Sequence, residues 1–156
     1  MVEDREEDAG LVDHILRKDG MNFTLRRVET REEFIKELDV FEPDTILSDH
    51  SLPQFDSVDA LNICRQSGKN IPFILVTGTV SEEFAVNTLK QGADDYILKS
   101  NLIRLPSAIK SAIQQHRLRE EKQKEEEKIR QQNEQLIKIL KNCYTSDCVI
   151  IIIIRN

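Results

Sequence analysis

Strand-like segments alternate along this chain with segments in which apolar residues recur every three or four positions. The strand-like segments are residues 23–28, 45–47, 72–76 and 96–98. The last three are almost wholly apolar, which is typical of parallel strands that are covered on both faces. The three-to-four spacing between them is that of amphipathic helices. This alternation predicts an α/β fold in which helices cover both faces of a parallel sheet.

The start of the chain leaves little room for a first strand. A helical pattern begins near Glu6, so only Met1 and Val2 can extend before the acidic residues. Together with the four strand-like segments, this short start predicts a doubly wound five-stranded parallel sheet whose first strand is truncated. The first strand of such a sheet is usually interior. Either this strand is a stub, or the sequence lacks residues that precede it in a longer chain.

A change of composition after residue 116 predicts how the chain is organised. All five Gly and all four Pro lie before it, and residues 117–142 contain neither. We expect a globular domain over residues 1–117, a helical connector over 118–142 and a tail over 143–156. The tail contains five consecutive Ile residues, and it fits either the first strand of a missing domain or a scrambled reading frame.

The connector has the composition of a long exposed helix. Leu118, Ile129, Leu136 and Leu140 fall loosely on a heptad seam, and Ile129 and Leu136 are separated by one full repeat. Such a seam predicts a parallel coiled coil, and hence a homodimer. A single solvated helix fits the same pattern equally well.

Composition also narrows the class of protein. The formal net charge of −6 argues against binding to nucleic acid through bulk charge. The chain has no run of about 20 apolar residues that would predict a membrane-spanning helix, and no signal peptide pattern opens it. Three cysteines without CxxC spacing are typical of reduced thiols, and three histidines without ligand spacing are expected at the surface. We therefore expect a cytoplasmic protein.

Chemically distinct side chains stand where the predicted strands end. These are the pair Glu3-Asp4, then Asp49, Thr77 and Lys99. Because the carboxyl ends of parallel strands meet at one edge of a sheet, these side chains should converge there. Converging carboxylates repel one another unless a cation joins them, and oxygen ligands suit Mg²⁺. A hydroxyl and an ammonium group suit a phosphoryl group, and a carboxylate can attack phosphorus to become an aspartyl phosphate.

Taken together, four motifs at these strand ends resemble the receiver domain of two-component response regulators. The motifs are Glu3-Asp4, Asp49-His50-Ser51-Leu52-Pro53, Val76-Thr77-Gly78-Thr79 and Asp95-Tyr96-Ile97-Leu98-Lys99. Their order and separations are similar to those of that family over residues 1–117, above all to receivers joined to PAS or sensor kinase modules. The resemblance implies a flavodoxin-like receiver of strand order 2-1-3-4-5 with a C-terminal helical or coiled-coil extension.

The resemblance assigns a phosphoacceptor and a metal site. Asp49 would accept the phosphoryl group. Asp4 and Asp49 would bind Mg²⁺ directly, together with the backbone carbonyl of Ser51, and Glu3 would bind it through water.

The resemblance also assigns groups that respond to the phosphoryl group. Thr77 would donate a hydrogen bond to the phosphoryl oxygens, and Lys99 would pair with them. Tyr96 would be a switch residue that turns inward as Thr77 moves. The surfaces of residues 84–91 and 96–113 would carry the signal outward.

The function that the resemblance implies is phosphoacceptor signalling in a two-component phosphorelay. A histidine kinase or a phosphotransfer protein would transfer a phosphoryl group from phosphohistidine to Asp49 with Mg²⁺. Such a domain catalyses only its own phosphotransfer and dephosphorylation, so the chain is not expected to be an enzyme in the usual sense.

Two other functions stay open at this point. The short first strand favours a receiver-fold module that binds protein partners without being phosphorylated. A Mg²⁺ phosphatase that works through an aspartyl phosphate typically needs a second Asp two residues after the nucleophile, and Ser51 occupies that place.

Overall fold

The computed structural model describes residues 1–50, 52, 55–78 and 81–145. The chain divides into two compact units, Met1–His116 and Arg117–Asn156. The first unit combines parallel strands with helices, which is the α/β class that the sequence predicts.

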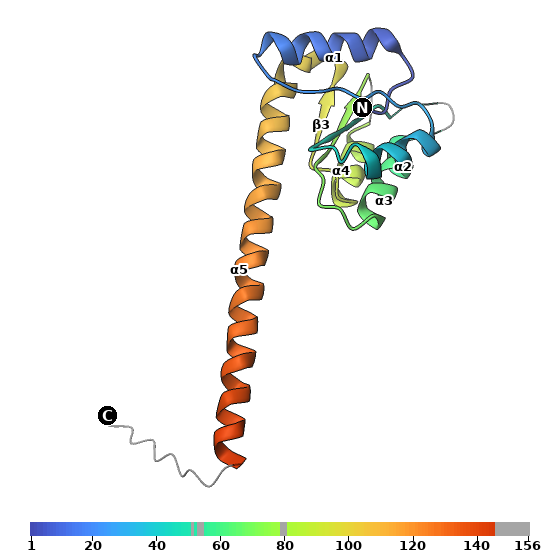
Figure 1. Ribbon diagram of the computed structural model, residues 1–156. Helices are drawn as coiled ribbons and strands as arrows, with labels where there is room; N and C mark the ends of the chain where they lie inside the picture. The colour runs from blue at the N-terminus through green and yellow to red at the C-terminus, as the bar shows by residue number, and fades with distance from the viewer. Residues whose placement is uncertain (51, 53–54, 79–80, 146–156) are drawn as a thin grey trace. The chain divides into compact units, whose positions relative to one another are not determined.

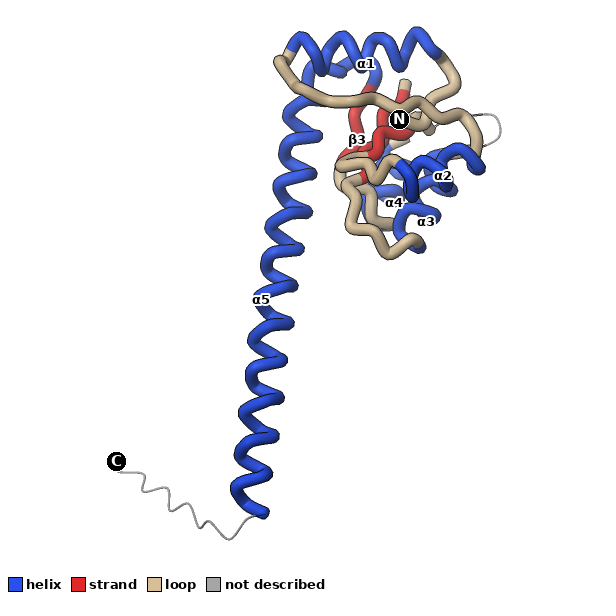
Figure 2. The backbone as a smooth tube through the Cα atoms, viewed as in Figure 1, coloured by secondary structure: helices blue, strands red, loops and turns tan. Residues whose placement is uncertain are grey.

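Three parallel strands form the sheet of the first unit (Figures 1 and 2). They are β1 (Ile46–Ser48), β2 (Phe73–Thr77) and β3 (Asp95–Leu98), with β2 in the middle. In this register Thr77 lies beside Leu98. Strands β1 and β2 are buried at every position, because elements pack on both of their faces.

The sequence predicts five strands with a truncated first strand, and the structure describes three. In the described residues, the first two predicted strands are single-residue bridges, in which Val2 pairs with Val28 on one side and with β1 on the other. The Val2 N–H donates to the Leu47 carbonyl at 2.8 Å, and the Val28 N–H donates to the Met1 carbonyl at 2.9 Å. Residues 23–27 belong to none of the strands that the structure describes.

Five α-helices and one 3₁₀ helix complete the described part of the chain. They are α1 (Glu6–Lys18), α2 (Arg31–Val40), α3 (Ser57–Gln66), α4 (Glu82–Lys90), η1 (Lys99–Arg104) and α5 (Leu105–Thr145). Side-chain oxygens of Thr30, Asp56 and Ser81 accept hydrogen bonds from the first N–H groups of α2, α3 and α4. These caps satisfy donors that have no partner within a helix, and so they fix where the three helices begin.

Two apolar clusters pack on the sheet. One joins Ile46 and Phe73 to residues of α2 and α3, such as Phe34 and Leu61. The other joins Leu47, Ile74 and Val76 to residues of α1 and α5, namely Val12, Leu16, Leu105 and Ile109. Because neighbouring strand residues point to opposite faces, the two clusters lie on opposite faces of the sheet, as the alternating pattern of the sequence predicts.

A groove of about 430 Å³ lies beside Met1 and Val2. Its apolar lining includes Met1, Phe23, Leu25, Ile46 and Ile113. The α-amino group of Met1 donates a hydrogen bond to the Arg26 carbonyl. Burial lowers the pKa of this amino group to about 6, although the charge of Glu37 acts in the opposite direction.

One carboxylate ties several elements together at the amino end of β2. Asp94 accepts hydrogen bonds from the Phe73 N–H at 2.9 Å and from Arg65 Nη2 of α3 at 3.2 Å. His116 Nε2 of α5 lies 2.6 Å from Asp94 Oδ1, and His116 Nδ1 lies 3.2 Å from the Asn70 carbonyl. His116 is only 5% exposed, so the prediction that it lies at the surface is wrong. The signal that could have found it is its spacing, because His116 follows the buried Ala112 by four residues and so continues the apolar face of α5.

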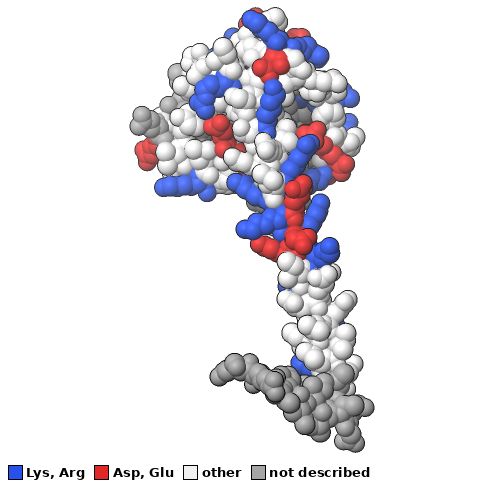
Figure 3. Space-filling view, turned by 90° about the vertical axis from the view of Figure 1, so that its left-hand side faces the viewer, with Lys and Arg blue, Asp and Glu red and all other residues white. Residues whose placement is uncertain are grey.

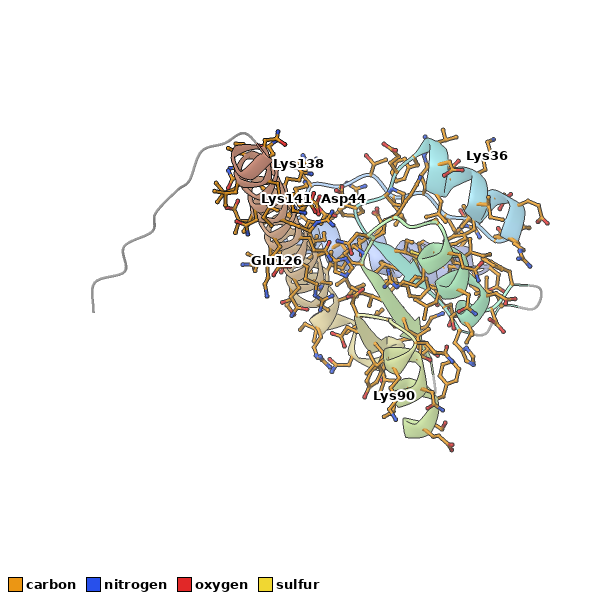
Figure 4. The ribbon with its side chains drawn as sticks, turned by 90° about the horizontal axis from the view of Figure 1, so that it is seen from below. Lys36, Asp44, Lys90, Glu126, Lys138 and Lys141 are labelled. Carbon is orange, nitrogen blue, oxygen red and sulfur yellow. The ribbon has the colours of Figure 1, made fainter. Side chains whose placement is uncertain are left out.

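The second unit contains the part of α5 that begins at Arg117. Arg130 pairs with Glu127 at 2.9 Å and with Glu134 at 3.8 Å, and Figure 4 shows the labelled side chains of this helix extending outward from it. Ile129 and Leu136 of the predicted heptad seam are 48% and 55% exposed. The coiled coil stays a prediction, and the predicted strand in the tail lies outside the described residues.

Candidate functional site

The carboxyl edge of the sheet brings together side chains from strands far apart in the sequence. Glu3 follows the bridging residue Val2, Asp49 follows β1, Thr77 ends β2 and Lys99 follows β3. The ammonium group of Lys99 lies 2.9 Å from Glu3 Oε2 and 2.8 Å from Asp49 Oδ2. Three of the predicted site residues therefore contact one another directly, as the parallel arrangement of the strands requires.

The ammonium group of Lys99 is shared among three carboxylates. Its third contact, at 2.6 Å, is with Asp8 Oδ2 of α1. Three acceptors can use all three N–H groups of a lysine. Burial opposes the charge of Lys99, but the hydrogen bonds that Lys99 donates to Asp49, Asp8 and Glu3 outweigh it and raise the pKa of Lys99 above its ordinary value. Lys99 is therefore a fixed positive charge at this edge of the sheet.

Asp8 is a site residue that the sequence reasoning missed. It stands in a run of acidic residues at the start of α1, where acidic side chains are common because they favour the helix dipole. Spacing does not distinguish it either, because Asp4 lies before the first residue of α1 and shares no helix face with Asp8. The hydrogen bond from Lys99 lowers the pKa of Asp8.

The acidic residues are held in a largely buried place. Glu3 is 0% exposed and Asp49 is 6% exposed. Burial raises the pKa of Glu3, while Lys99 and the N–H of Arg5 act to lower it. Asp49 Oδ1 accepts a hydrogen bond from the His50 N–H at 2.6 Å, so both carboxylate oxygens of Asp49 have a donor.

Thr77 carries a polar atom that is buried without a partner. Its hydroxyl oxygen is inaccessible, and no hydrogen-bond partner for it occurs among the described residues. A buried hydroxyl without a hydrogen bond costs free energy, so such groups are rare and often mark a functional site. A hydroxyl at this strand end fits an oxygen-bearing ligand that arrives beside Asp49.

A metal ion fits the same edge. Oxygen atoms of Glu3, Asp4 and Asp49 lie within 4.8 Å of one another. A set made only of carboxylate oxygens is the donor set that Mg²⁺ prefers. Ser51, whose backbone carbonyl completes the predicted ligand set, lies outside the described residues.

Two residues of the predicted motifs, Tyr96 and His50, have aromatic side chains. Tyr96, the predicted switch residue, lies on β3 and is 37% exposed. The ring of His50 lies 3.9 Å from the ring of Phe84 on α4, and its Nδ1 lies 3.1 Å from the Ser57 hydroxyl of α3. The residue after Asp49 thus connects the site to two helices.

A parallel α/β sheet with carboxylates, a hydroxyl and a lysine at its carboxyl edge defines a receiver-type fold and site. Residues 1–110 match the family of the response regulator receiver domain, and the chain belongs to that family. The predicted resemblance to the receiver domain of response regulators is therefore confirmed.

Curated relatives are response regulators that are longer than this chain. The transcriptional regulator NtrC of Proteus hauseri is 29% identical over 99 residues, which are 64% of this chain and 20% of that protein. The cell cycle transcriptional regulator CtrA of Caulobacter vibrioides is 28% identical over 99 residues, which are 64% of this chain and 42% of that protein. The chain thus spans less than half of the length of these relatives.

Solved structures extend the likeness to the fold. The receiver domain of a LuxO repressor from Vibrio parahaemolyticus has a TM-score of 0.69 and 26% identity, covering 76% of this chain and 91% of that one. A CheY-like receiver from Methanospirillum hungatei has a TM-score of 0.64 and 25% identity, covering 76% and 94%. The receiver of a histidine kinase from Syntrophus aciditrophicus has a TM-score of 0.58 and 31% identity, covering 72% and 86%.

Two further observations concern the surface and the helices. On the face seen in Figure 3, basic and acidic side chains are interspersed. Within the described residues, none of the helices combines the length and the apolar character needed to cross a membrane. The expectations of a cytoplasmic location and of no nucleic-acid partner stay predictions.

Proposed function

We propose that this chain is a phosphoacceptor, with Asp49 receiving a phosphoryl group from the phosphohistidine of a histidine kinase or phosphotransfer protein. The observation that carries the proposal is the arrangement around Asp49. This buried carboxylate lies within hydrogen-bond distance of Lys99, and beside it β2 ends in Thr77, whose buried hydroxyl has no partner in the described residues. A phosphoryl group binds well to a positive charge and a hydrogen-bond donor, and Lys99 and Thr77 offer these at the same edge of the sheet.

The transfer is a substitution at phosphorus. An oxygen of Asp49 attacks, the new O–P bond forms as the N–P bond of the phosphohistidine breaks, and the bonding electron pair returns to the imidazole nitrogen. Lys99 pairs with the phosphoryl oxygens and Thr77 donates a hydrogen bond to them. Asp4 and Asp49, with Glu3 through water, would hold Mg²⁺, which would supply positive charge that offsets the charge of the transferred group.

Phosphorylation then alters the surface beside the site. The phosphoryl group adds about 1.5 to 2 negative charges, which draw the Thr77 hydroxyl inward, and Tyr96 turns into the space that this movement opens. The output surface comprises α4, β3 and η1, where apolar side chains are exposed at Val86, Leu89, Tyr96, Leu98 and Ile103. The domain catalyses only its own phosphorylation and dephosphorylation.

The second unit supplies a dimer contact in this proposal. Ile129, Leu136 and Leu140 are exposed on α5 at heptad-like spacing, and pairing with a second copy would bury them. The exposed charges that flank them keep the helix soluble. We place the protein in the cytoplasm, where histidine kinases and phosphotransfer proteins have their phosphohistidines.

The test is intact mass spectrometry after incubation with acetyl phosphate and Mg²⁺. We expect a single adduct of about 80 Da, the mass of one phosphoryl group. Asp49→Asn should abolish the adduct, whereas Asp44→Asn, at an exposed position before β1, should retain it. If a sample with a folded circular dichroism spectrum gives no adduct, phosphoacceptor function is excluded for this chain.

A phosphorylation-independent binding module is the second candidate. It is favoured by the resting contacts of Lys99, whose ammonium group already has three carboxylate partners. Such a module would bind no Mg²⁺ at Glu3, Asp4 and Asp49. Calorimetric titration with Mg²⁺ separates the candidates, because only the phosphoacceptor requires saturable binding that Asp49→Asn weakens.

A further inference from the structure

Lys99 is held between the sheet and a helix. Two of its three carboxylate partners, Glu3 and Asp49, stand at strand ends. The third, Asp8, is on α1, and its contact of 2.6 Å is the shortest of the three. The side chains of Lys99 and Asp8 are 19% and 20% exposed, so this ion pair is largely shielded from water. It therefore keeps more strength than a surface ion pair would.

Phosphorylation would require Lys99 to change its acceptors. Each N–H of the ammonium group already has an acceptor in the resting state. When Asp49 carries a phosphoryl group, its carboxylate becomes part of an acyl phosphate, and the N–H that it held turns toward the phosphoryl oxygens. Glu3 and Asp49 belong to the cluster of oxygens that suits Mg²⁺. Asp8 lies outside that cluster and holds the ammonium group toward α1, with Arg5 Nη1 as a second partner of Asp8 at 3.7 Å.

We propose that Asp8 is a positioning residue that competes with the phosphoryl group for Lys99 and so weakens the phosphorylated state. This inference rests on the proposed phosphoacceptor function and deepens it. The carboxylate of Asp8 holds the ammonium group on the α1 side of the site, and the phosphoryl group binds Lys99 at the expense of that contact. Replacing Asp8 by a neutral residue of the same shape frees Lys99 for the phosphoryl group.

Opposite effects on cation and anion binding distinguish this role from a structural one. Asp8→Asn removes a negative charge near the acidic cluster, so Mg²⁺ should bind about twofold to fivefold more weakly. At saturating Mg²⁺, a phosphoryl mimic should bind about fivefold to tenfold more tightly, since Lys99 leaves a neutral amide more easily than a carboxylate. Damage to the fold would weaken both.

The experiment uses beryllium fluoride as the phosphoryl mimic on the full chain. Beryllium is titrated in excess fluoride at saturating Mg²⁺ and followed by ¹⁹F NMR, with a separate calorimetric titration of Mg²⁺. Asp8→Glu should restore the parent affinities. Glu6→Gln is the matched control, because Glu6 lies in the same first turn of α1 and is exposed. Glu7 is unsuitable as a control, because its partner Arg5 also pairs with Asp8.

The outcomes separate the two proposals. Tighter binding of the mimic to Asp8→Asn, with Glu6→Gln unchanged, supports the positioning role. Equal or weaker binding to Asp8→Asn overturns it while the parent chain still binds the mimic. An equal gain in Glu6→Gln also overturns it, because the effect would then be one of bulk charge. If the parent chain binds no mimic and gives no acetyl phosphate adduct, the phosphoacceptor function itself fails.

Discussion

At the scale of single residues, the burial of the Thr77 hydroxyl costs free energy in the unphosphorylated protein. This hydroxyl lacks a partner in the described part of the chain, whereas the equally buried Thr88 hydroxyl donates to the Phe84 carbonyl at 2.9 Å. The two threonines have the same side chain and nearly the same burial, and they differ in whether the hydroxyl is satisfied. A Thr→Val substitution at each of the two positions can therefore separate an effect on stability from an effect on phosphorylation.

Thr77→Val should stabilise the unphosphorylated protein. Replacing an unsatisfied buried hydroxyl by a methyl group removes a desolvation cost of about 1–3 kcal/mol, so the free energy of unfolding should rise, as measured by urea denaturation. The same variant should accumulate less phosphoryl adduct. Thr88→Val, which breaks a hydrogen bond, should lower the free energy of unfolding by about 1 kcal/mol. A loss of stability in Thr77→Val would show that its hydroxyl is satisfied.

At this scale, the sequence predicted contacts between side chains correctly where each residue follows a strand. Glu3, Asp49 and Lys99 were expected to meet because each follows a strand of one parallel sheet, and they do. Asp8 was missed because an acidic residue in the first turn of a helix has an ordinary explanation. His116 was placed wrongly because its burial depends on Asp94 and Asn70, which are distant in sequence.

At the scale of elements, the segment 23–28 is where sequence and structure differ most. It has the composition of a strand, but a strand also needs a partner along its length, and only Val28 pairs, with Val2. The sequence could therefore predict the β character of this segment and not how little of it is paired. The groove beside Met1 is lined by Phe23 and Leu25 of this segment.

Adding Ile-Leu-Ile before Met1 should fill the groove and stabilise the first unit. Each apolar side chain that becomes buried contributes about 1.5–3 kcal/mol, measured as a rise in the free energy of unfolding. The extension also removes the α-amino group of Met1, whose pKa is lowered from 8.0 to about 6 in the folded state. In the parent chain the unfolded state binds more protons between these values, so this group makes stability rise with pH across that window.

The extended chain should lose this part of the pH dependence. Acetylation of Met1 is the control that removes the charge without filling the groove, so it should abolish the slope and give little of the added stability. A Gly-Ser-Gly extension should leave the groove unfilled. If the apolar and polar extensions give equal stability, the groove does not accept a strand.

At the scale of the whole molecule, the chain combines a receiver with a long exposed helix. The boundary expected near residue 117 follows from composition, because residues 117–142 contain neither Gly nor Pro. Whether α5 pairs with a second copy depends on a few seam positions, and these are too sparse for the sequence to decide between a coiled coil and a single helix.

A chain ended at Asn142 should form a dimer in sedimentation equilibrium experiments. This end removes the isoleucine run, so that any association reports on the helix. Leu136→Glu should shift the chain toward monomer, because it places a charge in the apolar seam. Gln131→Glu, off that seam, should leave the dimer intact. A monomer at all concentrations would support the single solvated helix.

The carboxylate of Asp94 has a consequence for cooperativity. It joins the first residue of β2, helix α3 and helix α5 through Phe73, Arg65 and His116. Loosening any one of these elements removes a hydrogen-bond partner from a buried carboxylate, which costs free energy. In hydrogen-exchange experiments, the amides at the start of β2 and around His116 should therefore open together, as a single unit whose protection approaches that of global unfolding.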